Sequence, residues 1–176
     1  MPRFIALLFL CAMGAAAGMA EPNPLDPDSE GEVTISHVSG KPVPRFEALR
    51  FGDVNGRLGP SEDHDILWNY QRVGLPLLVI KETTGWRFVR DPDGAEVWMR
   101  SRMLTASETA MALSDGTLLA APRRDARAVA EMEAGAVVTL GRCEAGYCHV
   151  SSGRHGGWAP KSVLWGASVP TRRAGE

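Results

Sequence analysis

The sequence lacks an excess of positive charge. Its 176 residues include 19 Lys and Arg against 21 Asp and Glu, a formal net charge of −2. Residues 1–20 hold one Arg and no acid, so the remaining chain carries 18 basic residues against 21 acidic ones. Binding to nucleic acid depends on dense Lys and Arg contacts with phosphates, and a basic membrane-surface patch needs the same residues. The composition therefore argues against both classes of partner.

The sequence also has no apolar run long enough to span a membrane. Its most apolar stretch, Phe4–Leu10, is much shorter than the roughly 20 residues that a spanning helix needs. Arg3 precedes this stretch, small residues end it at Gly18-Met19-Ala20, and Glu21-Pro22 follows. These features predict a secretory signal peptide over residues 1–20. We expect an exported, periplasmic protein without a membrane span after cleavage; a retained N-terminal anchor is the alternative.

Cysteine is scarce, with three residues in the chain. Cys11 lies in the predicted signal peptide after the bulky pair Phe9-Leu10, which argues against a lipoprotein cysteine. Cys143 and Cys148 lie on the two arms of a predicted hairpin, where cross-strand Cα distances of about 4.5–5.5 Å allow a disulfide. In an oxidising compartment we expect these two cysteines to form one disulfide, which adds roughly 2 kcal/mol to the free energy of unfolding in the chain-entropy model.

An internal repeat organises the rest of the chain. Each copy holds a proline, a glycine, two aromatic residues and a leucine, and the spacings between them agree within one residue. The landmarks are Pro60, Gly74, Trp86, Trp98 and Leu104 in the first copy and Pro122, Gly135, Tyr147, Trp158 and Leu164 in the second. Matching periods of about sixty residues indicate two copies of one structural unit.

Both copies consist of short alternating segments separated by Gly, Pro and Asp turns, which predicts an all-β protein. We expect two tandem small barrels over residues 44–104 and 107–166, packed against each other or held at a restricted angle, because almost no linker separates them. Residues 21–43 are rich in Pro and acid and predict a flexible arm, although Val33–Val38 alternates and could add a short strand. Asp125–Ala130 is expected to form only a turn, and residues 167–176 a solvated tail.

One segment of the first copy resembles a known family. Val54–Ser61 reads Val-Asn-Gly-Arg-Leu-Gly-Pro-Ser, similar to the Val/Leu-Asn-Val-Arg-x-Gly-Pro-Ser strand of tandem bacterial SH3-like (SH3b) domain proteins of the cell envelope. Gly85-Trp86 and Gly157-Trp158 resemble the later Gly-Trp pairs of that family. Two departures stand out: the second copy has no Asn and Arg before Pro122, and Val97 precedes Trp98 where glycine is usual.

The resemblance implies two tandem SH3-like β-barrels and a cell-wall ligand, either peptidoglycan stem peptides or an envelope protein partner. Polar and aromatic side chains of the first copy are the candidate ligand-binding residues: Asn55, Arg57, Trp68, Tyr70 and Trp86. Asn55 and Arg57 share one face at i and i+2, and their alternative role is a buried hydrogen-bond network that closes the turn. The three aromatic residues are alternatively core or rim packing.

The leading interpretation is a non-catalytic binding or scaffolding protein that needs no cofactor or metal. A small exported Cys peptidase using Cys143 or Cys148 is one alternative, although His149 adjoins Cys148 on a strand and so points to the opposite face. Too few ligands lie near these cysteines for a zinc site. The other alternative is a docking partner that acts only through its N-terminal arm.

Overall fold

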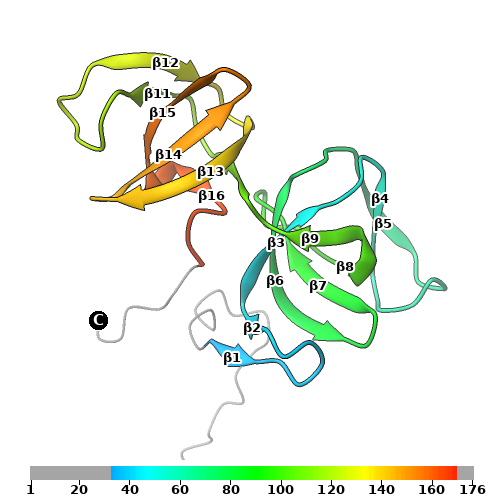
Figure 1. Ribbon diagram of the computed structural model, residues 1–176. Helices are drawn as coiled ribbons and strands as arrows, with labels where there is room; N and C mark the ends of the chain where they lie inside the picture. The colour runs from blue at the N-terminus through cyan, green and yellow to red at the C-terminus, as the bar shows by residue number, and fades with distance from the viewer. Residues whose placement is uncertain (1–32, 170–176) are drawn as a thin grey trace, which may run out of the picture.

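The computed structural model describes residues 33–169 and is almost entirely β-structure (Figure 1). It contains two seven-stranded sheets, each curled into a small barrel, and a separate two-stranded sheet. The predicted signal peptide, the first part of the predicted arm and residues 170–176 of the predicted tail lie outside the described residues. Within the described part of the chain, no helix is both long and apolar enough to cross a membrane.

The first barrel has the strand order β5-β4-β8-β7-β6-β3-β9. Its strands are β3 (Arg45–Leu49), β4 (Val54–Arg57), β5 (Ile66–Tyr70), β6 (Pro76–Thr83), β7 (Trp86–Arg90), β8 (Glu96–Arg100) and β9 (Leu104–Ala106). The 3-10 turn η2 (Ser101–Met103) precedes β9. Leu104–Ala106 pairs with β3, so the first barrel extends to Ala106, two residues beyond its expected end.

The second barrel has the order β12-β11-β15-β14-β13-β10-β16, the same arrangement strand for strand. Its strands are β10 (Thr109–Ala112), β11 (Gly116–Leu119), β12 (Ala128–Met132), β13 (Val137–Glu144), β14 (Tyr147–Ser152), β15 (His155–Pro160) and β16 (Leu164–Trp165), with the 3-10 turn η3 (Lys161–Val163) between the last two. The predicted repeat and the predicted all-β class are confirmed. Ala128–Met132 is a strand where only a turn was expected, because its pairing with β11 outweighs the helix propensity of its residues.

Alternation of apolar and polar residues gives each barrel one buried face. In β8 and β10, buried residues alternate with half-buried ones, as a strand with one face on a core requires. The first core is formed by Leu49, Val54, Leu75, Leu77, Val79, Val89, Val97, Met99 and Leu104, and the second by Ala110, Ala112, Leu118, Met132, Val138, Cys148, Val150, Ala159 and Leu164. The smaller side chains of the second core leave it with less apolar volume.

The glycine landmarks of the repeat have a backbone explanation. Gly74 and Gly135 both adopt a φ of 78°, a left-handed conformation that residues with a Cβ rarely adopt. Each donates its N–H over 2.8 Å to an equivalent carbonyl, that of Leu49 in the first barrel and that of Ala112 in the second. The two glycines therefore occupy the same third position of equivalent turns, residues 72–75 and 133–136.

Val97, which stands where the family usually has glycine, is compensated by Gly56, which stands where the family strand has valine. A Cβ on Gly56 would lie 2.7 Å from a methyl group of Val97, so the small residue in β4 makes room for the large one in β8. In the second barrel the sizes are exchanged: a Cβ on Gly157 of β15 would lie 2.8 Å from the Cβ of Leu118 in β11. Each barrel thus has one glycine and one bulky residue where these two strands meet.

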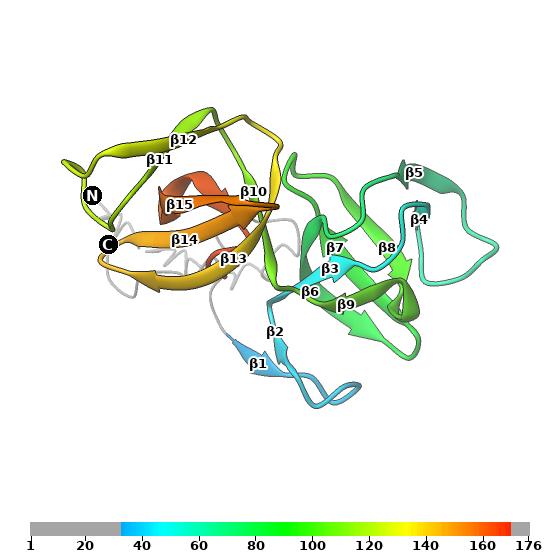
Figure 2. The same ribbon diagram turned by 45° about the horizontal axis from the view of Figure 1, so that its top comes forward.

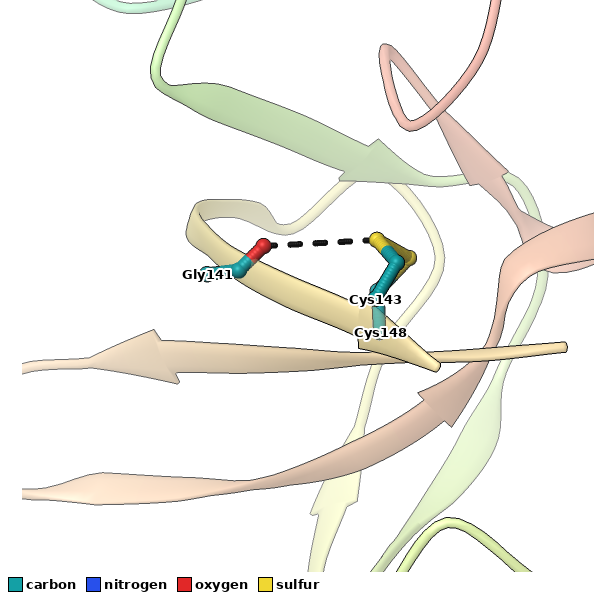
Figure 3. The surroundings of a disulfide bond; sticks show 3 residues. All are labelled: Gly141, Cys143 and Cys148. Atoms are coloured by element: carbon teal, nitrogen blue, oxygen red, sulfur yellow. Dashed lines mark hydrogen bonds between the residues drawn. A yellow bond between two sulfur atoms is a disulfide. The ribbon is translucent and has the colours of Figure 1, made fainter. Parts of the chain in front are cut away.

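The hairpin of each barrel is held by a different cross-strand pair. In the second barrel, Cys143 of β13 faces Cys148 of β14, and the two form a disulfide with a Cα–Cα distance of 4.0 Å (Figure 3). The Sγ of Cys143 also lies 4.0 Å from the carbonyl oxygen of Gly141. At the equivalent pair of the first barrel, Glu82 faces Arg87, with Nε 2.8 Å from Oε2. A covalent bridge and an ion pair therefore occupy the same place in the two copies.

Residues 33–43 form a β-hairpin, so the prediction of a flexible arm over residues 21–43 is wrong for this part of it. β1 (Thr34–Ile35) and β2 (Pro42–Val43) pair into a two-stranded sheet beside the first barrel (Figure 1). Side chains of the connecting turn, Ser36 and Ser39, donate hydrogen bonds to Glu82. Arg45 joins the same group, with 2.8 Å to Glu82 and 3.1 Å to the carbonyl of Pro42. The composition of residues 33–43 does not predict these contacts, because Glu82 lies about forty residues away in the sequence.

The two barrels pack against each other, as the short connection between β9 and β10 predicts (Figure 2). Trp165 of β16 donates a hydrogen bond from Nε1 to the carbonyl of Pro76 over 2.9 Å, and its ring meets that of Phe46 edge-on at 5.2 Å. Thr109 Oγ1 donates to the carbonyl of Gly74 over 2.6 Å. Met111 of the second barrel packs on the first core. Pro76–Val79 is buried on both faces, consistent with this contact.

The exchange of sizes between β4 and β8 predicts energetic coupling. Gly56→Ala should reduce the free energy of unfolding by about 1–3 kcal/mol through overpacking against Val97. Adding Val97→Gly removes the clash, so the double variant should be more stable than the sum of the single effects by at least about 0.5 kcal/mol in urea unfolding. Gly56→Ala combined with Val150→Ala, in the other barrel, should be additive. Additivity of the first pair contradicts the steric explanation.

Glu82 predicts an acid-sensitive contact between the hairpin β1–β2 and the first barrel. Burial raises the pKa of this carboxyl, but hydrogen bonds from Ser36, Ser39 and Arg45 outweigh burial and lower the pKa to about 2. A carboxyl with a depressed folded-state pKa stabilises the fold above its unfolded pKa and loses that contribution as the pH falls toward the folded value. The stability difference between the native protein and Glu82→Gln should therefore shrink from pH 5 to pH 2. A stability difference that stays constant from pH 5 to pH 2 would contradict this role. The control is Glu144→Gln, which changes an exposed carboxylate.

Candidate ligand-binding groove

A groove of about 210 Å³ lies on the first barrel. It is lined by residues from β4, from the start of β7, from the end of β8, from η2 and from the loop between β4 and β5: Asp53, Val54, Asn55, Arg57, Glu62, Trp86, Arg100, Arg102 and Met103. Three of the five predicted residues, Asn55, Arg57 and Trp86, line it together. Three arginines give the groove a cationic wall.

Trp86 and Arg100 form the base of the groove. They are direct cross-strand partners at the open end of the β7–β8 hairpin. The Arg100 guanidinium lies 4.6 Å from the centre of the Trp86 ring, a cation–π contact that holds its planar face. Trp86 is only 5% exposed, so it supports Arg100 from below and offers little surface of its own.

Arg57 and Asn55 belong to hydrogen-bond networks at the rim. Arg57 donates from Nη1 to the carbonyls of Glu62 over 2.9 Å and His64 over 2.7 Å, so it fixes the loop between β4 and β5. Asn55 accepts a hydrogen bond of 3.0 Å from Asn69, which also donates to Asp53 over 2.6 Å. The alternative predicted for this pair was a buried network that closes the turn; the network is present, but its hydrogen bonds are exposed. A β-bulge between Gly56 and Arg57 accompanies it.

Glu62 places a carboxylate in the groove. Arg100 donates to its Oε1 from Nε over 2.9 Å and from Nη2 over 2.6 Å. Hydrogen bonding from Arg100 and its charge, with the charges of Arg102 and Arg57, lower the pKa of Glu62. The Glu62 side chain is 57% exposed, so this pair sits at the mouth of the groove and is accessible to solvent.

Trp68 and Tyr70 lie outside the groove, although both alternate on β5. The Tyr70 ring packs on the first core, and its hydroxyl donates to Asp91 over 3.0 Å. Burial and the neighbouring Asp91 raise the pKa of Tyr70 well above its usual range. Trp68 is 57% exposed, as are its neighbours Ile66 (50%) and Leu67 (45%) on the edge strand β5. One aromatic residue of the strand is therefore core and the other is surface.

Sequence reasoning missed Glu62, Arg100 and Arg102. A signal for Arg100 was available, because Asp91-Pro92-Asp93-Gly94 is typical of a turn, and a hairpin turn there places positions 86 and 100 opposite each other. Glu62 lies in an irregular loop, where no periodicity fixes the direction of a side chain. Its contact with Arg100 spans 38 residues of sequence.

The second barrel does not repeat the groove chemistry. Strand register aligns Thr117 with Asn55, Leu119 with Arg57, Tyr147 with Trp86 and Pro160 with Arg100. The aromatic base is kept while the guanidinium and amide groups are replaced by apolar or small side chains. Within residues 33–169 no group of three or more His, Cys, Asp and Glu is placed to hold a metal ion. His149 instead packs edge-on against Trp158, with ring centres 5.6 Å apart.

Comparison with known proteins agrees with this architecture. The sequence model described as bacterial SH3 domain matches residues 52–105 and 114–166, one match for each barrel. No curated protein matches the chain. Among solved structures, NlpC1 from Trichomonas vaginalis is 14% identical, with a TM-score of 0.31 over 75% of this chain and 48% of that one. NlpC2 from the same organism is 11% identical, with a TM-score of 0.31 over 69% of this chain and 47% of that one.

The chain thus spans about half the length of these two solved structures. The two family matches cover more than half of its own length and coincide with the two barrels that the strand order defines. The protein belongs to the bacterial SH3 domain family, of which it carries two tandem copies.

Proposed function

We propose that the protein is an exported, non-catalytic binding module whose first barrel binds carboxylate-bearing peptides of the cell envelope. The observation that carries this proposal is the Arg100 guanidinium, stacked on Trp86 and paired with a carboxylate at the mouth of a groove. Peptidoglycan stem peptides carry such carboxylates, and so do acidic segments of envelope proteins. We take the stem peptide as the first ligand to test.

The exposed Glu62 carboxylate supports a carboxylate ligand. It occupies the position in which a ligand carboxylate would meet Arg100, and it is held there by two hydrogen bonds from one side chain. Arg is the residue best suited to planar recognition of carboxylates. A ligand that offers a carboxylate therefore exchanges one ion pair for an equivalent one, and Glu62 acts as an internal competitor.

The remaining features favour binding by the barrel over the alternatives. A disulfide sulfur carries no thiolate, so the bridge between Cys143 and Cys148 disfavours a Cys peptidase. The described part of the N-terminal arm is bonded to Glu82 and Arg45 of its own barrel, which disfavours a protein that docks only through that arm. The bridge is also consistent with export, because disulfides persist in oxidising compartments.

The state of the thiols tests the peptidase alternative. In protein purified from the periplasm and denatured without reductant, we expect Cys143 and Cys148 to be unreactive toward a thiol reagent, because both sulfurs are in the bridge. After reduction, two thiols per chain should react. A free thiol before reduction would restore the peptidase as a candidate.

Co-sedimentation with purified peptidoglycan sacculi tests the proposed ligand. We expect saturable binding that Arg100→Ala weakens at least about tenfold, because a hydrogen bond to a charged group contributes about 1.5–3 kcal/mol. Glu62→Gln should strengthen binding, because it weakens the internal competitor. Arg154→Ala, an exposed arginine of the second barrel, is the matched control. Trp68→Ala should have little effect, since Trp68 lies outside the groove.

Two results would contradict the proposal. Loss of binding with Arg154→Ala but not with Arg100→Ala would place the ligand elsewhere on the protein. Absence of saturable binding at micromolar protein would remove the cell-wall version, and cross-linking in the periplasm would then seek an acidic protein partner.

A further inference from the structure

The second barrel has a larger opening than the groove of the first, on a different face of the fold. Its volume is about 650 Å³, and it lies where β12 faces β13 and β14. Leu118, Met132 and Val138 line it and are each at most 6% exposed, so they form an apolar floor. Glu131 and Glu133 line its rim and are exposed.

Divergence between the two copies explains the opening. Strand register places Met132 where the first barrel has Tyr70, since these residues pair with Gly116 and Val54 respectively. In the first barrel the Tyr70 ring packs on the core and its hydroxyl bonds to Asp91 across the same space. Ser152 takes the place of Asp91. The second barrel therefore lacks the tyrosine–aspartate contact that spans this position in the first.

The opening borders an unpaired strand edge. In the described chain β12 pairs with β11 alone, while β13 pairs with β14 and β10 (Figure 2). The outer edge of β12 therefore offers free backbone N–H and C=O groups, which an extended peptide can pair with. Alternation along β12 places Glu131 on the face opposite Met132, and the exposed Glu133 directly follows the end of the strand.

These three features select one kind of occupant. We propose that the second barrel binds an extended peptide of alternating basic and apolar residues, added as a strand to the free edge of β12. Its basic side chains lie opposite Glu131 and Glu133, neither of which forms an ion pair with another described residue. Its apolar side chains, one residue out of phase, enter the opening over Met132. This site has a charge preference opposite to that of the first-barrel groove.

A capped peptide of three Lys-Val pairs is the probe, and a capped peptide of three Glu-Val pairs is its control. Titration of the full exported chain, followed by amide NMR, should show saturable binding of the Lys peptide alone, weakened by salt. The backbone amides of residues 128–132 should become protected from exchange, which a non-strand ligand does not require. Absence of saturable binding below millimolar concentration, or equal binding of both peptides, overturns the proposal.

Two variants separate the charged rim from the opening. Glu131→Lys with Glu133→Lys should weaken the Lys peptide at least about tenfold, whereas Glu144→Lys, on the hairpin tip, should not. Met132→Tyr with Ser152→Asp restores the first-barrel pair and should abolish binding while leaving the fold intact by amide NMR. Undiminished binding by both variants overturns the site. Binding that persists without protection of residues 128–132 would mean that the peptide does not pair with β12, and it would overturn strand addition.

The proposal for the second barrel and the proposed function of the first can be overturned separately. Arg100→Ala should leave binding of the Lys-Val peptide unchanged, because Arg100 lies on the first barrel. Loss of that binding with Arg100→Ala would mean that the two barrels share one site, which also overturns this inference. Loss of sacculus binding alone would count only against the proposed function.

Discussion

Closure of each barrel depends on a close approach between two strands that are far apart in sequence. β4 reaches β8 in the first barrel and β11 reaches β15 in the second, and each contact consists of one residue pair in the ladder. Next to this pair the strands approach so closely that a Cβ on Gly56 of β4, or on Gly157 of β15, would lie within 3 Å of the facing side chain. One glycine is therefore required at the crossing, but either strand can supply it.

This freedom lets the two copies diverge without a change of fold. The glycine lies on β4 in the first copy and on β15 in the second, while the strand order, the hairpin register and the turn glycines are the same. The hairpin pair also differs, being an ion pair of Glu82 and Arg87 in the first copy and a disulfide of Cys143 and Cys148 in the second. Both changes keep the geometry of a cross-strand pair and alter only its chemistry.

The two barrels also differ in the chemistry of their surfaces. In the first, Arg57, Arg100 and Arg102 surround one carboxylate, and Tyr70 spans the space beside β5. In the second, the arginine positions carry Leu119 and Pro160, and acidic residues border an opening over Met132. The interface through Trp165 holds these different surfaces on one unit. The groove of the first barrel and the opening of the second are therefore bordered by charges of opposite sign. The net charge of the whole chain is close to zero and does not indicate this difference.

Local sequence determined the repeat, the all-β class and the pairing of Cys143 with Cys148. Turn residues and alternation of period two act over a few residues, so they are legible without knowledge of the rest of the chain. Three of the five predicted residues came together in the groove for the same reason: Asn55 and Arg57 share a strand, and Trp86 follows a clear hairpin turn.

Only the tertiary structure decided how much of a strand face is covered by the core. Trp68 and Tyr70 share one face of β5, but Tyr70 packs on the first core and bonds to Asp91, whereas Trp68 is exposed. The contacts of Glu62 with Arg100, of Ser39 with Glu82 and of Trp165 with Pro76 join segments 38, 43 and 89 residues apart. Such contacts depend on long-range pairing between elements, and the period of a single strand carries no information about them.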